Sequence, residues 1–340
     1  YPHAVTPHAP VRALRAAQGV AAAGAVKAPG SQASNTRAGN QNLTAEKADT
    51  FTLGGVFGSP WEGQWTDRLT VSLDYYNIKI KDPILVFDTN TAIASCFNYN
   101  GANPTYSNTN VYCAGIQRTG GSLTNATINN PLAPLTGDRA WPFENGGVVK
   151  TSGVDVQIAY GFDWAWMGLP DWMGRVDTSL LVTHVLNYEQ ADRQGLPATD
   201  YTGTISYFGA GLGSSFPDWK ATFNTRLSFD EVGVMGWTAS DFSLGSRVRF
   251  IDAMKNRQFA QYPGETFLGT AGVNPNVKST FYWDLDATLG LTDNVELKIG
   301  VNNVLDQQPR LYAPNVQSGT DPSTYDIVGR RLFGQVKMRF

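Results

Sequence analysis

The residues of this chain that could hold a metal or a phosphate are few and scattered. Its three histidines are His3, His8 and His184, and no set of further ligands converges on any of them in the sequence. Glycines between positions 209 and 213 lack the G-x-G-x-x-G spacing, and no helical pattern follows that would aim backbone N–H groups at a phosphate. We therefore expect no metal site and no cofactor.

Two pairs of charged residues could do chemistry if a strand presents them on one face. Asp284 and Asp286 could imitate the carboxylates of a glycosidase, and Arg247 and Arg249 could attract anions. A solvated strand face explains both pairs equally well. No nucleophile is discernible beside a base and an orienting group, so we predict no catalytic residue and no enzyme.

The two cysteines, Cys96 and Cys113, lie in a stretch rich in Asn, Tyr and Gly. This setting predicts a disulfide that closes a surface loop in an oxidising compartment, although two unpaired thiols are the alternative. The loop side chains could bind a polyol or an organic chelate through amides and aromatic rings, or could simply be solvated. The candidates are Asn98, Tyr99, Asn100, Tyr106, Asn108 and Tyr112.

Composition narrows the class of protein. The formal net charge is -3 and no basic cluster runs along the chain, so nucleic acid is not an expected partner. No segment approaches the roughly 18 to 20 consecutive apolar residues of a spanning helix. A barrel strand shows only about 10 residues of alternating polarity, so a mean hydropathy of -0.24 does not separate a soluble β-protein from a membrane barrel.

The elements that must position these residues are β-strands. Residues 1–45 have no periodic pattern and are predicted to be irregular, whereas residues 46–340 contain segments in which apolar and polar side chains alternate. The clearest is 281–291, with Asp284 and Asp286 on one face. About nine strands are expected in all, near 46–57, 67–82, 150–162, 174–188, 219–229, 236–251, 281–291, 295–302 and 331–340.

The links between these strands alternate in length. Short links are expected near 58–66, 163–173, 230–235 and 292–293, and long links near 83–149, 189–218, 252–280 and 306–329. Outer-membrane barrels have short periplasmic turns and long extracellular loops, so this order predicts an all-β, antiparallel transmembrane barrel. Six tryptophans at or beside short links fit an aromatic girdle, or else are ordinary core residues. They are Trp61, Trp65, Trp164, Trp166, Trp172 and Trp237.

Three motifs resemble one known family. Residues 300–306, with the sequence GVNNVLD, lead to 329–340, GRRLFGQVKMRF, which resembles the closing segment of TonB-dependent receptors. A second stretch, 39–54, is similar to the family's entry into a mid-barrel strand, although Gln41 and Ala45 replace two usual prolines. A third, 146–155, resembles the return from a long cysteine-containing loop.

The resemblance covers residues 39–340 and implies a 22-stranded outer-membrane barrel of a Gram-negative bacterium. It also implies an amino-terminal plug and a TonB box that couples to the TonB complex. Nine is an odd number of strands, and such a wall cannot close on itself as bacterial single-chain barrels do. We therefore expect the chain to be about the last nine strands of a larger barrel, to lack the plug and the TonB box, and to be inactive in transport by itself. Residues 1–38 are then an extracellular loop or an artefact of truncation.

The resemblance also implies partners and site residues. The barrel assembly machinery would read the alternating apolar side chains of the last strand, Leu332, Val336, Met338 and Phe340. Membrane lipid and lipopolysaccharide would surround the wall, while Arg247, Arg249, Asp284 and Asp286 would face the lumen.

The implied function is energy-coupled uptake of a scarce nutrient, namely a ferric siderophore, a cobalamin or an oligosaccharide. The sequence does not choose among these ligands. A passive porin-like barrel and a secreted carbohydrate-binding β-sandwich are the alternatives.

Overall fold

The computed structural model describes most of the chain, in segments. These are residues 9–17, 37–61, 63, 65–66, 68–86, 95–98, 102–114, 116–117, 127–128, 141–191, 194–195, 197–205, 215–234, 237–256, 274–292, 294–312 and 319–339. Helical segments within them are short: α1 (Ala9–Ala17), α3 (Val111–Ala114), η1 (Trp164–Met167) and η2 (Asp171–Met173). No helix in these segments is long and apolar enough to cross a membrane.

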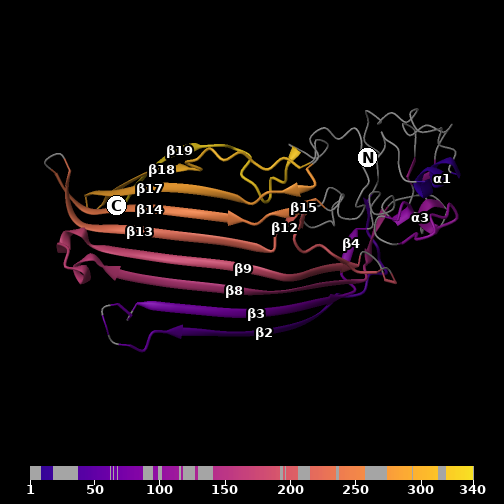
Figure 1. Cartoon of the computed structure of the whole chain (residues 1–340), viewed down its shortest axis with the longest axis horizontal. Helices are drawn as coiled ribbons and strands as arrows, with labels where there is room; N and C mark the ends of the chain where they lie inside the picture. The colour runs from indigo at the N-terminus through magenta and orange to yellow at the C-terminus, as the bar shows by residue number, and fades with distance from the viewer. Residues whose placement is uncertain are drawn as a thin grey trace.

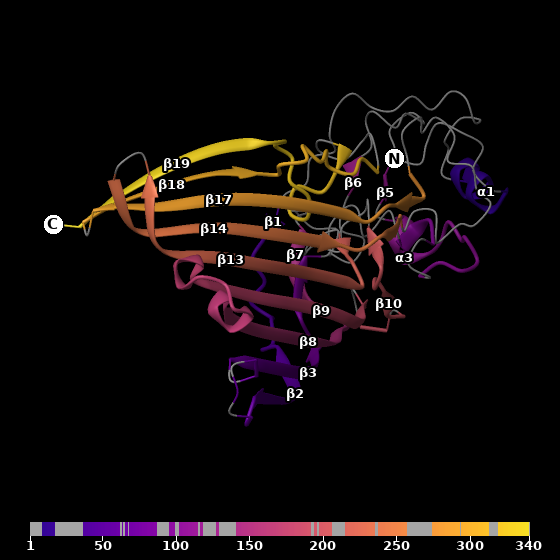
Figure 2. The same ribbon diagram turned by 60° about the vertical axis from the view of Figure 1, so that its left-hand side comes forward.

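One large sheet dominates the described structure (Figures 1 and 2). Its long strands lie side by side in chain order and every neighbouring pair is antiparallel. They are β2 (Lys47–Gly58), β3 (Leu69–Lys81), β8 (Val148–Asp163), β9 (Arg175–Ala191), β13 (Trp219–Val234), β14 (Trp237–Ile251), β17 (Thr280–Thr292), β18 (Val295–Asn302) and β19 (Arg331–Met338). The short β10 (Thr199–Asp200) pairs with β9. All nine expected strands are therefore present.

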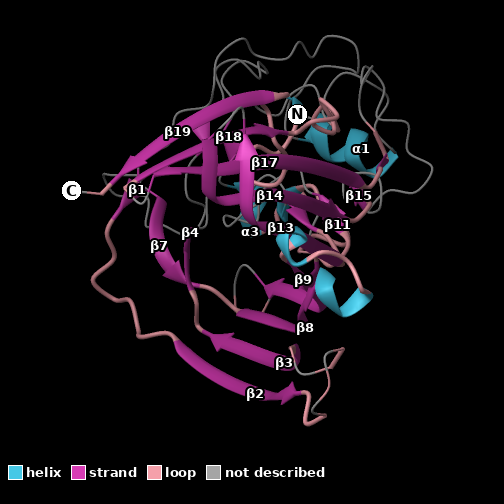
Figure 3. Cartoon of the chain, turned by 90° about the vertical axis from the view of Figure 1, so that its left-hand side faces the viewer, coloured by secondary structure: helices cyan, strands magenta, loops and turns pink. Residues whose placement is uncertain are grey.

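The sheet is curved and open. Viewed along the strands, it forms an arc whose edge strands, β2 and β19, do not meet (Figure 3). Strand-to-strand twist accounts for the curvature, and nine antiparallel strands form part of a barrel wall. The predicted fold class, an antiparallel barrel in incomplete form, is confirmed.

The wall has one apolar and one polar face, because side chains alternate along each strand and the register places like residues opposite each other. Leu285 lies opposite Val301, which lies opposite Leu332. Members of the apolar face include Leu53, Tyr75, Val154, Leu180, Phe223, Val248, Trp283, Leu285, Leu289, Leu297, Ile299, Val336 and Met338. Members of the polar face include Asp74, Asp155, Asp177, Asn224, Arg226, Arg247, Asp284, Asp286 and Lys298.

The apolar face is not covered by a second sheet. Leu53, Ile299 and Leu332 are 67%, 56% and 80% exposed. A β-sandwich buries one face of each sheet against the other, so the alternative of a secreted carbohydrate-binding β-sandwich is wrong for the described wall.

Long and short links lie at opposite ends of the wall. The short links are residues 59–68, 164–174, 235–236 and 293–294, and the long ones are 82–147, 192–218, 252–279 and 303–330. The predicted alternation is confirmed, and the disulfide-bearing α3 lies at the end opposite the carboxy terminus (Figure 1). The two ends of the wall are called the short-link end and the long-link end below.

The long links carry structure that the sequence did not predict. Three small sheets involve these links. The first consists of β7 (Trp141–Asn145), β4 (Ile84–Val86) and β1 (Arg37–Ala38), which precedes β2 in the chain. The second consists of β12 (Ser215–Phe216), β11 (Thr204–Ile205), β15 (Met254–Asn256) and β16 (Asn276–Val277), and the third of β5 (Ile116–Gln117) and β6 (Thr127–Ile128). Helix α1 lies within residues 1–45, where the sequence shows no periodic pattern. Its Leu14 is buried, and Asn108 donates a hydrogen bond to the carbonyl of Ala17 (3.2 Å).

A buried apolar cluster joins the ends of the strands to three long links. It consists of Ile205, Ile251, Met254, Val277, Tyr282, Tyr312 and Tyr325, and is called the link core below. Because these residues come from four separate parts of the chain, the cluster fixes the links relative to the wall.

Candidate functional site

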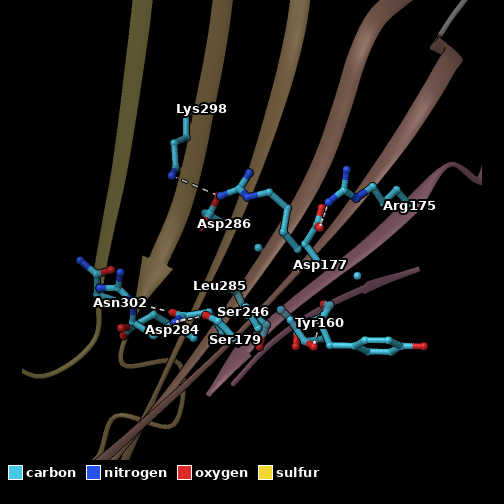
Figure 4. A pocket seen from close by; sticks show the side chains of 18 of the residues that line it. Tyr160, Arg175, Asp177, Ser179, Ser246, Asp284, Leu285, Asp286, Lys298 and Asn302 are labelled. Carbon is cyan, nitrogen blue, oxygen red and sulfur yellow. Dashed lines mark hydrogen bonds and ion pairs between the residues drawn. The ribbon is translucent and has the colours of Figure 1, made fainter. Parts of the chain in front are cut away.

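The polar face holds a hollow of about 600 Å³, here called the wall pocket (Figure 4). Seven adjacent strands, from β8 to β19, contribute to its lining. Five cationic side chains, Arg68, Arg175, Arg226, Arg247 and Lys298, line it together with three carboxylates, Asp177, Asp284 and Asp286. The excess of two positive charges favours an anionic ligand.

Asp286 of β17 is the electrostatic centre of the pocket. Its Oδ2 lies 3.2 Å from Nζ of Lys298 on β18 and 3.5 Å from Nη2 of Arg226 on β13. Strand β14 runs between β13 and β17, and its Gly245 lies opposite Arg226 on one side and opposite Asp286 on the other. A Cβ at Gly245 would lie 2.5 Å from Oδ1 of Asp286. The missing side chain therefore lets charges from non-adjacent strands meet.

Arg247 differs from the other cations of the pocket, because each of those contacts a carboxylate whereas the hydrogen-bond partner of Arg247 is neutral. Its Nε donates to Oδ1 of Asn224 (3.1 Å), and the amide of Asn224 donates to Oγ of Ser179 (3.1 Å). Elsewhere in the pocket Arg175 pairs with Asp177, and Arg68 pairs with Asp163 at 2.9 Å. The exposed guanidinium of Arg247 thus keeps most of its charge available to a ligand.

Arg249 lies beside the pocket and holds the last long link against the wall. Its guanidinium donates two hydrogen bonds to Asp326, at 3.1 and 2.7 Å, and its Nε lies 3.3 Å from Asp284. The same group lies over the ring of Tyr282, 4.9 Å from the centroid. Two-point contact with a carboxylate gives geometric specificity, so the Arg249 guanidinium fixes the position of Asp326, and with it the link, against the wall.

The four charged residues expected on one face are indeed on one face. Register places Arg247 opposite Asp284, and Arg249 and Asp286 share their side of the sheet. Three of them line the pocket, whereas Arg249 does not. That this face lines a lumen stays a proposal.

The closing GVNNVLD motif has a structural role. Asn303 and Asp306 both adopt left-handed backbone conformations, with φ of 55° and 53°, which asparagine and aspartate tolerate better than most residues. The Asn303 N–H donates to Oδ1 of Asp284 (2.8 Å), and Oδ1 of Asp306 accepts from the Arg330 N–H (2.8 Å). The motif therefore fixes both ends of the last long link.

Cys96 and Cys113 form a disulfide in the structure. Asn103, which is 1% exposed, organises the loop between them. Its amide donates to the carbonyls of Cys96 (2.7 Å) and Ser107 (3.0 Å), and its Oδ1 accepts from the Ser107 N–H (2.9 Å). Sequence reasoning missed Asn103 because nothing distinguishes it from the neighbouring asparagines.

Three of the expected ligand-contacting side chains of this loop, Asn98, Asn108 and Tyr112, are engaged with the protein itself. Asn98 accepts a hydrogen bond from the Asn103 N–H (3.1 Å), and Tyr112 is buried. Tyr106 adopts a left-handed conformation, with φ of 52°. Tyr99 and Asn100 lie outside the described residues. Ligand contact by this loop stays a prediction.

Hydrogen bonds around Asp321 tie two long links together. Its carboxylate accepts from Oγ of Ser215 (2.5 Å) and Oγ of Ser323 (2.6 Å). Burial alone would raise the pKa of Asp321, but these bonds stabilise the charged form and together outweigh burial, so the pKa lies below its ordinary value. Burial raises the pKa of the nearby Tyr325 well above its ordinary range.

Three residues of the expected assembly signal, Leu332, Val336 and Met338, are exposed on the apolar face of β19. Phe340 lies outside the described residues. Recognition by the assembly machinery therefore stays a prediction.

Within the described segments, no three His, Cys, Asp or Glu side chains are grouped so that they could hold a metal ion.

Sequence reasoning also missed Arg226, Gly245 and Asp326 as members of the site. Alternation alone would have put Arg226 on the polar face, but its approach to Asp286 depends on the register across β14. Asp326 lies 77 residues from Arg249, in a link without periodic pattern. No sequence signal would have paired them.

A family model described as "TonB dependent receptor-like, beta-barrel" matches residues 4–304. This range includes residues 4–38, which the sequence motifs left unmatched. No curated protein matches the sequence.

Three similar solved structures have low sequence identity to this chain. A mutant ferric enterobactin receptor from Pseudomonas aeruginosa in complex with enterobactin has 15% identity and a TM-score of 0.48, over 89% of this chain and 32% of that one. The FrpB iron transporter from Neisseria meningitidis (F5-1 variant, apoprotein form) has 14% identity and a TM-score of 0.45, over 90% and 33%. The pyoverdine receptor FpvA from P. aeruginosa PAO1, bound to pyoverdine, has 14% identity and a TM-score of 0.41, over 90% of this chain and 31% of that one. This chain thus spans about a third of their length.

Proposed function

The chain belongs to the family of TonB-dependent receptor-like β-barrels, and from this membership we propose that it forms part of an outer-membrane receptor for energy-coupled nutrient uptake. The single observation that carries the proposal is the two-faced wall. An exposed apolar face suits lipid, and a polar face with charged side chains suits a wet lumen.

The transported ligand is proposed to be anionic, and a ferric siderophore fits best among the ligands considered. Support comes from the five cations against three carboxylates in the wall pocket. Arg247 is the residue proposed to contact a passing ligand, because its partner Asn224 leaves its charge uncompensated. Neither a neutral oligosaccharide nor cobalamin requires such an excess.

The proposed partners are the TonB complex, engaged through a plug and a TonB box, and the barrel assembly machinery at Leu332, Val336 and Met338. In this topology the long-link end faces the outside and the short-link end faces the periplasm. Ligand capture would then begin on the long links and continue over the polar face.

Uptake of a radiolabelled ferric chelate by cells that produce the full-length protein tests the proposal. Uptake that stops when a protonophore dissipates the inner-membrane gradient supports energy coupling. Uptake that continues unchanged would favour the passive porin-like barrel, and no uptake of any anionic chelate would contradict the proposed ligand class.

Arg247→Gln tests the proposed ligand contact. It removes the uncompensated charge and is expected to raise the half-saturating ligand concentration by about tenfold, the effect of roughly 1.4 kcal/mol. Arg331→Gln is the matched control, because Arg331 is an exposed arginine of β19 that does not line the wall pocket. Equal effects of both changes would remove the support for this contact.

A further inference from the structure

A cluster of lysines lies at the long-link end of β2, β3 and β8. Its members are Lys47, Lys79, Lys81 and Lys150, together with the carboxylates Asp49 and Glu189, and it is called the outer basic patch below. The wall pocket, on the other face of the sheet, includes none of these residues.

The strand register places the whole patch on one face. Lys79 lies opposite Asp49 on one side and opposite Lys150 on the other, and Lys150 lies opposite Glu189. Lys81 lies opposite Lys47. Lys79 is an even number of residues from Tyr75 on β3, so the patch shares the apolar face of the wall.

The apolar face changes character in layers as it approaches the patch. Tyr75 lies opposite Leu53 and diagonally across from Phe51, with the two aromatic ring centroids 6.3 Å apart. In the next row neutral polar residues appear, because Asn77 lies opposite Phe51 on one side and opposite Ser152 on the other. The lysines follow at Lys79, about 13 Å along the strand from Tyr75 at the usual rise per residue. Apolar, aromatic, polar and cationic layers in this order match the transition from acyl chains to headgroups.

The patch is not electrically neutral. Its four lysines face two carboxylates, which leaves an excess of two positive charges. Among the described residues, the ion pairs of the patch are Lys81 with Asp49 (2.8 Å) and Lys150 with Glu189 (3.0 Å). These pairs are at least partly exposed, so an anion can compete for both ammonium groups. Lys79 lies between the two pairs, opposite Asp49 and Lys150.

We propose that the outer basic patch binds the phosphate groups of lipid headgroups in the outer leaflet of the membrane around the wall. The ammonium groups of Lys79 and Lys150 contact one phosphorylated headgroup, and the acyl chains of the same lipid lie over Tyr75 and Phe51. The inference uses the proposed function only for the presence and direction of the membrane. It adds a lipid site on the outside of the wall.

Lipid binding to the full-length protein, purified in detergent and stripped of lipid, tests the proposal. The probes are bis-phosphorylated lipid A and the same lipid with both phosphates removed, and bound lipid is counted by native mass spectrometry across a titration. The test variant is Lys79→Gln with Lys150→Gln. The control is Lys220→Gln with Lys337→Gln, which removes two lysines from the polar face.

The wild-type protein is expected to bind the phosphorylated lipid more tightly than the dephosphorylated one. The test variant should bind the phosphorylated lipid about 25-fold more weakly, at roughly fivefold for each lysine. The control should stay within about twofold of the wild type. The proposal would be overturned if the wild type bound both lipids equally well, or if the test variant bound the phosphorylated lipid as tightly as the wild type.

Two further readouts separate a loss of lipid binding from a failure of the barrel to assemble and from a loss of transport. Heat-shifted electrophoretic mobility of the folded barrel reports whether the test variant assembles, and a triple change with Lys47→Gln provides a second, stronger step in the same series. Ligand uptake by the test variant is expected to remain normal, so loss of lipid binding and loss of transport are distinguishable.

Discussion

The wall and the long links place their large hydrophobic side chains in opposite ways. On the wall, apolar side chains such as Ile299 and Leu332 are exposed, whereas at the long-link end Tyr282, Tyr312 and Tyr325 are fully buried. The links thus have a core of the kind found in water-soluble proteins. The wall has a backbone ladder and two surfaces but little core of its own.

This difference follows from the surroundings that each region needs. A side chain gains stability from burial only if its neighbours or its solvent are apolar. Within a bilayer the lipid supplies that environment, while strand pairing satisfies the backbone groups. The links extend beyond the apolar band and must bury their own tyrosines. Each of the following changes tests one side of this contrast.

Tyr325→Ala should have the largest effect, confined to the links. It removes a buried ring from the link core and is expected to destabilise residues 303–330 locally by about 3–5 kcal/mol. Hydrogen exchange of the backbone amides in that link measures the loss.

Tyr325→Phe is the matched control for this change. The buried hydroxyl of Tyr325 forms no hydrogen bond with any described residue, so its removal should cost almost nothing. Equal losses for both variants would show that the ring is not what holds the link.

Ile299→Arg should be the most costly change on the wall. On an exposed surface in water this substitution is nearly neutral, but at the middle of a bilayer an arginine costs about 2–4 kcal/mol. Urea unfolding of the full-length protein in phospholipid vesicles gives the value.

The polar face provides the comparison for Ile299→Arg. Gln157→Arg places the same side chain on the polar face of β8, where Gln157 is exposed, and should change the unfolding free energy by less than about 0.5 kcal/mol. If both arginines cost the same, the two faces do not meet different solvents.

Arg249→Met should release the last long link without affecting the wall. It leaves Asp326 and Asp284 without their shared cation, at a cost of about 1–2 kcal/mol for partly exposed pairs. Faster proteolysis or exchange within 319–330, with unchanged exchange in β14 and β17, is the expected result. Arg249→Lys should recover only part of the protection, because lysine lacks the two-point contact.

Apart from the control variants, Asp321→Asn should have the smallest effect, and the effect should depend on pH. Because the pKa of Asp321 lies below its ordinary value of 3.8, its carboxylate contributes stability above that value and loses the contribution as the pH falls through the lowered pKa. At neutral pH the variant should lose about 1 kcal/mol of protection in the two links that Ser215 and Asp321 join. Once the pH lies below the lowered pKa of Asp321, the two proteins should converge. A difference that is the same at both pH values would show that the ionised form is not what Ser215 and Ser323 stabilise.

The structure of the wall can be predicted from the sequence to a greater extent than the structure of the long links. A period of two residues identifies the face of each strand, and alternating link lengths give the order of the strands, so 281–291 and its neighbours were predictable. The link core was not, because Ile205, Met254 and Tyr325 come from distant segments without periodic pattern. Two- and three-residue strands such as β11 leave too short a pattern to detect.

The wall pocket lies between these cases. Alternation predicts that Asp284 shares a face with Asp286 and that Arg247 shares a face with Arg249, because each prediction needs only the spacing within one strand. Contact between Arg226 and Asp286 needs the register of three strands and the absence of a side chain at Gly245. Single-sequence reasoning gives the face of a residue but not its partner.

Spin labels placed one at a time along β17, at positions 284 to 289 of the full-length protein in lipid vesicles, test the central claim most directly. We expect labels at Leu285, Ala287 and Leu289 to collide with oxygen dissolved in the lipid, and labels at Asp284, Asp286 and Thr288 to collide with a water-soluble nickel chelate. Accessibility should therefore alternate with a period of two residues. A flat profile, or an alternation with the opposite sign, would contradict a wall with one face toward lipid and one toward water.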